Sequence, residues 1–155
     1  MAPTPHVRIV PVEGEPLSFV FHIDGPDELV APGETTPVAS PYKGKVFECL
    51  VKVPAEYPHL APTDVLWKLG PGGKSTLFHP LVADGGDTCS NLWKPTWGAT
   101  STLGKLGTTL RAALAQPTAE AAVNADAMAL LQGAGKSIAN YCATAKAAAA
   151  ALPNA

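Results

Sequence analysis

The sequence predicts an α+β domain in which a small antiparallel sheet precedes a group of helices. Three observations lead to this prediction. Up to about residue 70, short runs of alternating apolar and polar side chains are separated by prolines and glycines. From about residue 100 onward the chain is rich in alanine and leucine, and apolar residues recur at helical spacing. No internal repeat or linker divides the chain, so residues 1–155 are expected to form a single domain.

Four strands are expected in the first half, each from apolar side chains that recur with a period of two. In the second strand, for example, Phe21 and Ile23 fall on one face, whereas Ser18 and His22 fall on the other. Residues 27–40 are rich in proline, glycine and acidic side chains, and we expect a surface loop there. Short strands in series with turns between them predict an antiparallel meander. The expected strands are 7–12, 17–23, 46–53 and 65–67.

Three helices are expected in the second half. The first follows Thr100 and Ser101, whose hydroxyls are suitable N-caps, and it ends before Pro117. Its leucines recur at helical spacing. Glycines separate the second helix from the third. The expected second helix runs from about Glu120 to Gln132, and the third from near Lys136 to before Pro153.

Composition and charge exclude several classes of function. The net charge of −2 and the lack of any lysine or arginine run give no reason to expect nucleic acid or an anionic membrane as a partner. No stretch reaches the ~18 apolar residues of a membrane span, and no secretory signal is recognisable. The three cysteines, Cys49, Cys89 and Cys142, are too widely spread for a disulfide framework or a zinc site. We therefore expect a soluble protein of the cytoplasm or nucleus, or both, with no metal and no cofactor.

The segment from residue 79 to residue 99 is the expected place of the functional site. It shows neither strand nor helix periodicity, and it contains histidine, proline, glycine, cysteine, asparagine and tryptophan. Such composition predicts an ordered loop between scaffold elements, and binding and catalytic residues are concentrated in loops of this kind.

Several short fragments place proline, glycine, aromatic and cysteine side chains at distinctive spacings, and they occur in a fixed order from residue 23 to about residue 131. They resemble the motifs of ubiquitin-conjugating enzymes and imply that family's fold. Each fragment is weak by itself, but the combination is specific. The fragments are Ile23-Asp24-Gly25-Pro26, Pro41-Tyr42-Lys43-Gly44-Lys45-Val46-Phe47, Pro54-Ala55-Glu56-Tyr57-Pro58-His59-Leu60-Ala61-Pro62, His79-Pro80, Gly86-Asp87-Thr88-Cys89 and Trp97, followed by Pro117 and Asn124.

The resemblance implies that Cys89 carries ubiquitin or a ubiquitin-like modifier as a thioester. The modifier would come from an activating enzyme and pass to a lysine or to a ubiquitin ligase. The thiolate is the attacking species in such chemistry. The resemblance also implies that His59, Ala99 and Thr100 lie in loops that meet the activating enzyme and the ligase. His79 resembles a family histidine that holds the loop, although a Cys/His pair with Cys89 stays open.

The sequence departs from the family pattern in ways that bear on activity. Leu81 stands where the family has the Asn of His-Pro-Asn, a residue associated with the oxyanion or the loop. Asn91, two residues after the thiol, is the candidate to replace it in part. Ala121 falls where many relatives carry an acidic residue at the gate for the acceptor lysine, and the adjacent Glu120 is the candidate substitute. Only a few residues precede the first strand, so we expect the basic N-terminal helix of the family to be missing from this sequence, either because docking of the activating enzyme is altered or because the chain is trimmed.

Other functions stay open at this point. The first alternative is a catalytically weak relative that binds ubiquitin or assists another conjugating enzyme; Leu81 favours it and Cys89 opposes it. The second is an unrelated cysteine hydrolase, which would need His79 and Asn91 or an aspartate close to Cys89. The modifier is also open: Tyr57-Pro58-His59, Asn91 and Asn124 are similar to the branch that serves the cullin-attached modifier, whereas the missing N-terminal extension argues against that branch.

Overall fold

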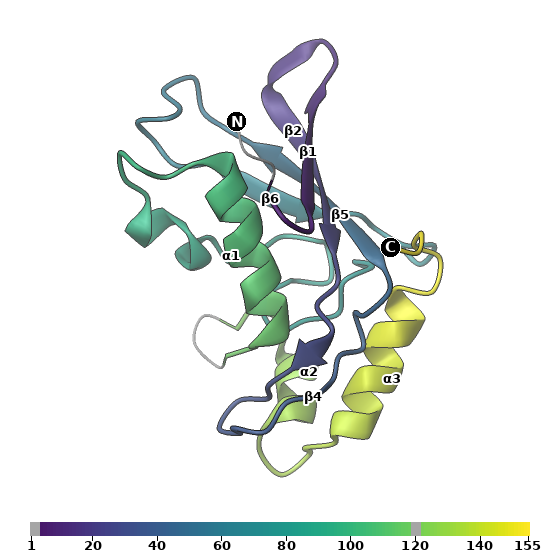
Figure 1. Ribbon diagram of the computed structural model, residues 1–155. Coiled ribbons are helices and arrows are strands. Elements are labelled where there is room, and N and C mark those ends of the chain that lie inside the picture. Colours follow the sequence, from purple (N-terminus) through teal and green to yellow (C-terminus); the bar gives the residue numbers. More distant parts are fainter. Residues whose placement is uncertain (1–3, 119–121) are drawn as a thin grey trace.

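The computed structural model describes residues 4–118 and 122–155 (Figure 1). Four strands form an antiparallel sheet in the order β1-β2-β5-β6. Each strand of this sheet pairs with the next of its strands along the chain. This order confirms the expected meander and the α+β class. The strands are β1 (Val7–Val12), β2 (Glu15–Asp24), β5 (Val46–Lys52) and β6 (Asp64–Trp67).

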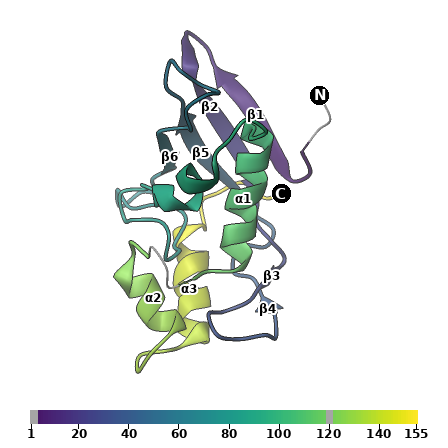
Figure 2. The same ribbon diagram turned by 90° about the vertical axis from the view of Figure 1, so that its left-hand side faces the viewer.

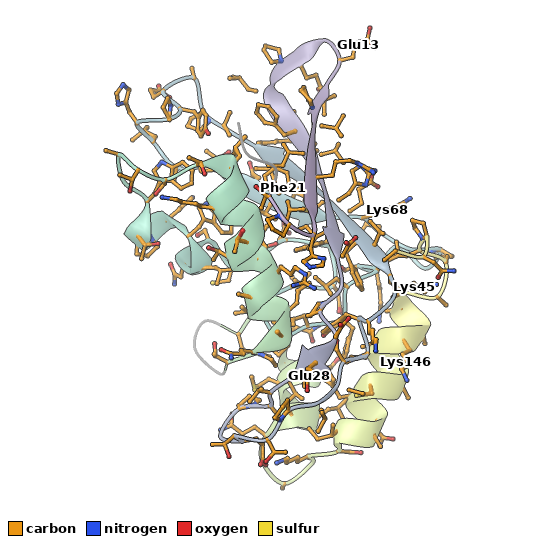
Figure 3. The ribbon with its side chains drawn as sticks, viewed as in Figure 1. Glu13, Phe21, Glu28, Lys45, Lys68 and Lys146 are labelled. Atoms are coloured by element: carbon orange, nitrogen blue, oxygen red, sulfur yellow. The ribbon has the colours of Figure 1, made fainter. Side chains whose placement is uncertain are left out.

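One face of the sheet forms the centre of the hydrophobic core. The register places Phe21 opposite Cys49, and Cys49 opposite Trp67, so a row of buried side chains crosses three strands. Figure 3 shows Phe21 between the sheet and helix α1 (Leu103–Ala115), whereas Glu13 and Lys68 lie at the periphery. Burial of these apolar faces explains why the period of two in the sequence located the strands correctly.

Residues 27–40 differ from the surface loop that the sequence predicts. They contain two short strands, β3 (Glu28–Leu29) and β4 (Val38–Ala39), which pair with each other. Leu29 is completely buried, and the amide of Val30 donates a 2.8 Å hydrogen bond to the carbonyl of Ala115 at the end of α1. The prediction was wrong because Leu29 and Ala31 anchor this otherwise largely exposed segment to the core.

Helix α1 packs against the sheet, and helices α2 (Ala125–Leu131) and α3 (Ile138–Ala148) lie together at the end away from the β1–β2 turn (Figures 1 and 2). Within α1, Leu106, Leu110 and Leu114 are buried, as their spacing predicts. No helix in the described part of the chain combines the length and the apolar character needed to cross a membrane.

The starts of α1 and α2 differ from the predicted ones, whereas α3 begins close to Lys136, as predicted. The N-cap of α1 is Thr102, whose hydroxyl accepts a hydrogen bond from the amide of Lys105, and not Thr100 or Ser101. Ser101 instead accepts a hydrogen bond from the amide of Gly98 in the preceding turn. Helix α2 begins only after its N-cap Asn124, and α3 begins after its N-cap Ser137. In each case a side-chain cap, rather than the apolar pattern, determines the first residue of the helix.

Candidate functional site

Cys89 lies at the end of an extended segment that runs beside strand β6. The amide of Thr88 donates to the carbonyl of Val65 at 3.1 Å, and the indole of Trp67 donates to the Thr88 hydroxyl at 2.8 Å. Gly86 makes this approach possible: it has a positive φ of 92°, and a Cβ there would lie 2.6 Å from the Trp67 carbonyl oxygen. Only glycine combines that conformation with that contact. The glycine of the Gly-x-x-Cys fragment therefore sets the path of the chain that leads to the thiol.

The backbone of Cys89 is held on both sides. Its amide donates to the carbonyl of Leu81 at 3.1 Å, and its carbonyl accepts from the amide of Leu92 at 3.2 Å. The second bond closes the short 3-10 helix η1 (Ser90–Leu92), which is followed by η2 (Lys94–Thr96). The thiol itself is free and half-buried. A fixed backbone with a partly accessible sulfur is suitable for a nucleophile that must meet another macromolecule.

The other two cysteines are less suited to reaction. Cys49 is 1% exposed in the core, and burial raises the pKa of its thiol far above the ordinary range. Cys142 is half-buried on α3, and burial raises its pKa as well, although Lys146 opposes the shift. Because the thiolate is the reactive form, both shifts disfavour reaction at these positions at neutral pH.

His79 is buried and uses both ring nitrogens within the protein. Its Nε2 lies 2.9 Å from the carbonyl oxygen of Ala113, and its Nδ1 lies 3.1 Å from the amide of Leu81. A carbonyl only accepts and an amide only donates, so the ring is neutral with its proton on Nε2. Burial lowers the pKa of His79 to about 4. The ring therefore connects α1 to the loop that carries Leu81, and it has no nitrogen left to take a proton from a thiol.

Leu81 is buried, whereas Asn91 is exposed. Leu81 is 6% exposed, so its side chain belongs to the core while its carbonyl holds the amide of Cys89. Asn91 is exposed in the middle of η1, two residues after the thiol. Asn91, the residue predicted to replace the missing asparagine in part, is therefore accessible to solvent.

Two loops that are far apart in the sequence lie side by side near the start of α1. The indole nitrogen of Trp97 donates a 3.0 Å hydrogen bond to the carbonyl of Pro58, and the rings of Trp97 and Tyr57 have centroids 6.0 Å apart. The predicted partner-binding residues His59, Ala99 and Thr100 are all exposed on these two loops. The fold therefore brings the predicted partner-binding residues to one region of the surface.

The predicted gate residues Glu120 and Ala121 lie outside the described residues. The segment that follows them is held by the loop that contains His79, because the amides of Val123 and Asn124 both donate to the carbonyl of Pro80, at 2.8 and 3.0 Å. Within residues 4–118 and 122–155, no group of three or more histidine, cysteine, aspartate or glutamate side chains could hold a metal ion.

Trp93, four residues after Cys89, is a packing residue whose hydrogen-bond partner the sequence does not indicate. Its side chain is 3% exposed, and its indole nitrogen donates a 2.8 Å hydrogen bond to the carbonyl of Pro62. A buried tryptophan usually finds an acceptor for its N–H group, so a partner could be expected, but the sequence does not indicate which carbonyl is near.

Comparison with known proteins agrees with this geometry. The family model described as ubiquitin-conjugating enzyme matches residues 33–148. The chain is 25% identical over 129 residues to ubiquitin-conjugating enzyme E2 S-C of Xenopus laevis, a match that covers 83% of this chain and 53% of the relative. It is 29% identical over 113 residues to ubiquitin-conjugating enzyme E2 S of Dictyostelium discoideum, covering 72% of this chain and 47% of the relative. The chain thus spans about half the length of these curated relatives.

Solved structures share the fold. The E2 domain of a ubiquitin-conjugating enzyme from Toxoplasma gondii superposes with a TM-score of 0.73 at 20% identity, covering 95% of this chain and 89% of that one. A protein described as a ubiquitin-conjugating enzyme from Plasmodium yoelii superposes with a TM-score of 0.77 at 17% identity, covering 99% and 87%. At these identities the structures establish the fold, whereas the family match covers most of the sequence. The chain belongs to the ubiquitin-conjugating enzyme family.

Proposed function

We propose that this protein carries ubiquitin or a ubiquitin-like modifier as a thioester on Cys89. The observation that supports the proposal best is the placement of this thiol. It is free and half-buried, and its residue is hydrogen-bonded through both its amide and its carbonyl in a loop beside the sheet. Among the three cysteines, Cys89 alone combines a fixed backbone in a loop with a sulfur that a macromolecular partner can approach.

In the first step the Cys89 thiolate attacks the carbonyl of the thioester between the modifier and the activating enzyme. A new S–C bond forms at Cys89, the S–C bond to the activating enzyme breaks, and that enzyme leaves as a thiolate. In the second step a lysine amine or a ligase cysteine attacks the new thioester, and Cys89 leaves as a thiolate. When lysine is the acceptor, the amine loses a proton to solvent or to a base as the isopeptide bond forms.

The second step needs a hydrogen-bond donor for the transient oxyanion. Leu81 offers only hydrocarbon in the position of the family asparagine, so we propose that the exposed amide of Asn91 takes this part. Loss of one oxyanion donor typically costs ~100-fold in rate. Transfer to lysine should accordingly be slower than formation of the thioester. His79 would contribute by holding Leu81, and hence the amide of Cys89, in place.

The exposed residues His59, Ala99 and Thr100 would form the surface for the activating enzyme and the ligase. The gate for the acceptor lysine would be formed by the segment that contains Glu120 and Ala121. A second candidate function is a catalytically weak module that binds ubiquitin or assists another conjugating enzyme. The observation that favours it is Leu81, which cannot stabilise an oxyanion by hydrogen bonding.

A charging experiment tests the proposal. The protein is incubated with activating enzyme, ATP and ubiquitin, and in parallel with the modifier that is attached to cullins and its own activating enzyme. Products are separated on gels with and without reducing thiol. We expect an adduct that disappears with thiol and is lost in Cys89→Ala.

Cys142→Ala is the matched control, because it removes another half-buried thiol that lies on helix α3 and not in the loop of Cys89. It should charge as well as the wild type. If folded protein forms no adduct with either modifier, the enzymatic proposal is wrong for these modifiers. The non-catalytic module then becomes the better description.

A further inference from the structure

The 3-10 turn that follows the thiol ends at a buried anchor. Trp93 comes directly after η1, and its amide donates to the carbonyl of Ser90 at 3.2 Å, just as the amide of Leu92 donates to the carbonyl of Cys89. The Trp93 indole, 3% exposed, donates to the Pro62 carbonyl at 2.8 Å. A buried hydrogen bond of this geometry is costly to break, because the carbonyl would remain unsatisfied.

These contacts connect Cys89 to a different part of the chain. Pro62 lies in the connection between β5 and β6, the same connection that carries the exposed His59. The two successive backbone hydrogen bonds of η1 connect Cys89 to the backbone of Trp93. The indole of Trp93 then connects this turn to Pro62. The turn that follows the thiol is therefore anchored at its far end to the β5–β6 connection, whereas the amide of Cys89 is held separately by the carbonyl of Leu81.

A second tryptophan makes a similar bond in a different place. Trp97 donates from its indole to the carbonyl of Pro58, in the same β5–β6 connection, but it is half-buried and lies beyond η2. Its bond joins the two partner-binding loops to each other and not to the turn that begins at Cys89. The Trp93 indole thus anchors the turn that follows the thiol, whereas the Trp97 indole joins the two loops that carry the predicted partner-binding residues.

We propose that Trp93 is a positioning residue for Cys89: its bond to Pro62 fixes the turn that presents the thiol to the incoming thioester. The proposal rests on the proposed function, because it concerns the rate at which Cys89 accepts the modifier. A small displacement of a reacting group is sufficient to slow such a step markedly, since the attack depends on distance and direction.

The test measures single-modifier transfer from charged activating enzyme to this protein, using whichever modifier charges the wild type. Trp93→Phe keeps an aromatic ring but has no N–H group, whereas Trp93→His has a smaller, five-membered ring whose Nε2 can donate from the place of the indole N–H. We expect Trp93→Phe to lower kcat about tenfold or more with KM nearly unchanged. Trp93→His should recover part of that loss. Trp97→Phe should instead raise KM and leave kcat close to that of the wild type.

The outcomes separate this inference from the proposed function. A wild type that does not charge overturns the proposed function. A wild type that charges, together with a folded Trp93→Phe of unchanged kcat, overturns only the role of Trp93. Equal losses of kcat in the Phe and His variants also overturn it, because the N–H group then makes no difference. Circular dichroism confirms that the compared variants are folded, and Trp93→Leu replaces the Phe variant if that one does not fold.

Discussion

His79 illustrates at the scale of a single residue how burial decides between a catalytic and a structural role. A histidine ten residues before a candidate nucleophile suggests a Cys/His pair. In the structure the ring lies inside the protein, between the Ala113 carbonyl and the Leu81 amide, and burial lowers its pKa to about 4. A neutral ring with both nitrogens engaged holds the loop, and it cannot also activate a thiol.

This burial predicts a pH dependence of stability. The pKa of His79 is about 4 in the folded protein and 6.5 for an unperturbed histidine, so below pH 6.5 the unfolded chain binds more protons than the folded one. The stability from a neutral His79 is complete above pH 6.5 and is lost as the pH falls from 6.5 toward about 4. The free energy of unfolding should fall by about 1.4 kcal/mol per pH unit over this window, about 3 kcal/mol in all.

The comparison is with His79→Gln, whose amide can donate and accept at the same two partners. Urea denaturation at several pH values should show the difference between wild type and variant shrinking as the pH falls. His59→Gln is the control, because His59 is exposed and its side chain makes no hydrogen bond or ion pair among the described residues. A wild type and a His79→Gln variant with parallel pH curves would contradict the assignment of a neutral buried ring.

At the scale of elements, the start of α1 shows why patterns locate a helix better than they locate its first residue. Thr100, Ser101 and Thr102 are all acceptable N-caps by residue type. The structure selects Thr102, whose hydroxyl accepts from the Lys105 amide at 3.1 Å. The turn that contains Gly98 and Ser101 determines this choice, because it uses the Ser101 hydroxyl for another bond.

Thr102→Ala should therefore lower the free energy of unfolding by about 1 kcal/mol, the usual cost of losing an N-cap. Thr100→Ala is the matched control: its side chain is exposed, and only its backbone carbonyl is bonded, to Lys105. A change within ~0.5 kcal/mol is expected for it. Chemical denaturation measures the free energy of unfolding of both variants. If Thr100→Ala loses as much stability as Thr102→Ala or more, the N-cap is at Thr100, as the sequence alone predicts.

At the scale of the whole molecule, the approach of α1 to the sheet depends on a glycine inside the helix. Gly107 is buried, and a Cβ there would lie 2.6 Å from Cγ1 of Val7 on strand β1. Val7 is branched at Cβ and has little rotamer freedom to withdraw. Glycine is costly within a helix, so its presence at this point indicates that the helix and the strand must come close.

Overpacking in Gly107→Ala should lower the free energy of unfolding by about 1–3 kcal/mol. The better helix propensity of alanine offsets up to ~1 kcal/mol of this loss. Gly104→Ala, in the same helix, is the control. Its Cβ would lie 2.7 Å from the hydroxyl oxygen of Thr4, the end of a side chain that can rotate away. We expect that variant to be neutral or slightly stabilised in thermal or chemical unfolding. A Gly107→Ala protein as stable as Gly104→Ala would show that the helix is free to shift from β1.

The tertiary structure also joins the two halves of the chain through polar side chains. The hydroxyl groups of Tyr42 and Tyr141 contact each other, and the Tyr42 hydroxyl donates to the Phe78 carbonyl at 2.6 Å. Tyr42 belongs to the sheet half and Tyr141 to α3, and both rings are completely buried. Buried hydroxyl groups need such partners, so the last helix has one preferred position against the rest of the domain.

The sequence by itself determined the class of fold, the four main strands, the three helices and the candidate thiol. Those features depend on local information: the period of apolar residues, the glycine and proline breaks, and short motifs such as Gly86-Asp87-Thr88-Cys89. The match to the ubiquitin-conjugating enzyme family confirms the family that these motifs indicate. The roles assigned to Cys89, Asn91 and the partner loops stay predictions, for which the charging experiment is the first test.

Only the tertiary structure decided the features that depend on contacts between distant parts of the chain. It buried Leu29 within an apparent surface loop, and it engaged both nitrogens of His79. It also brought the Trp93 indole to the Pro62 carbonyl, 31 residues away in the sequence. The physical reason is the same in each case: the cost of leaving an apolar surface in water or a buried polar group unpaired depends on neighbours that local sequence patterns do not specify.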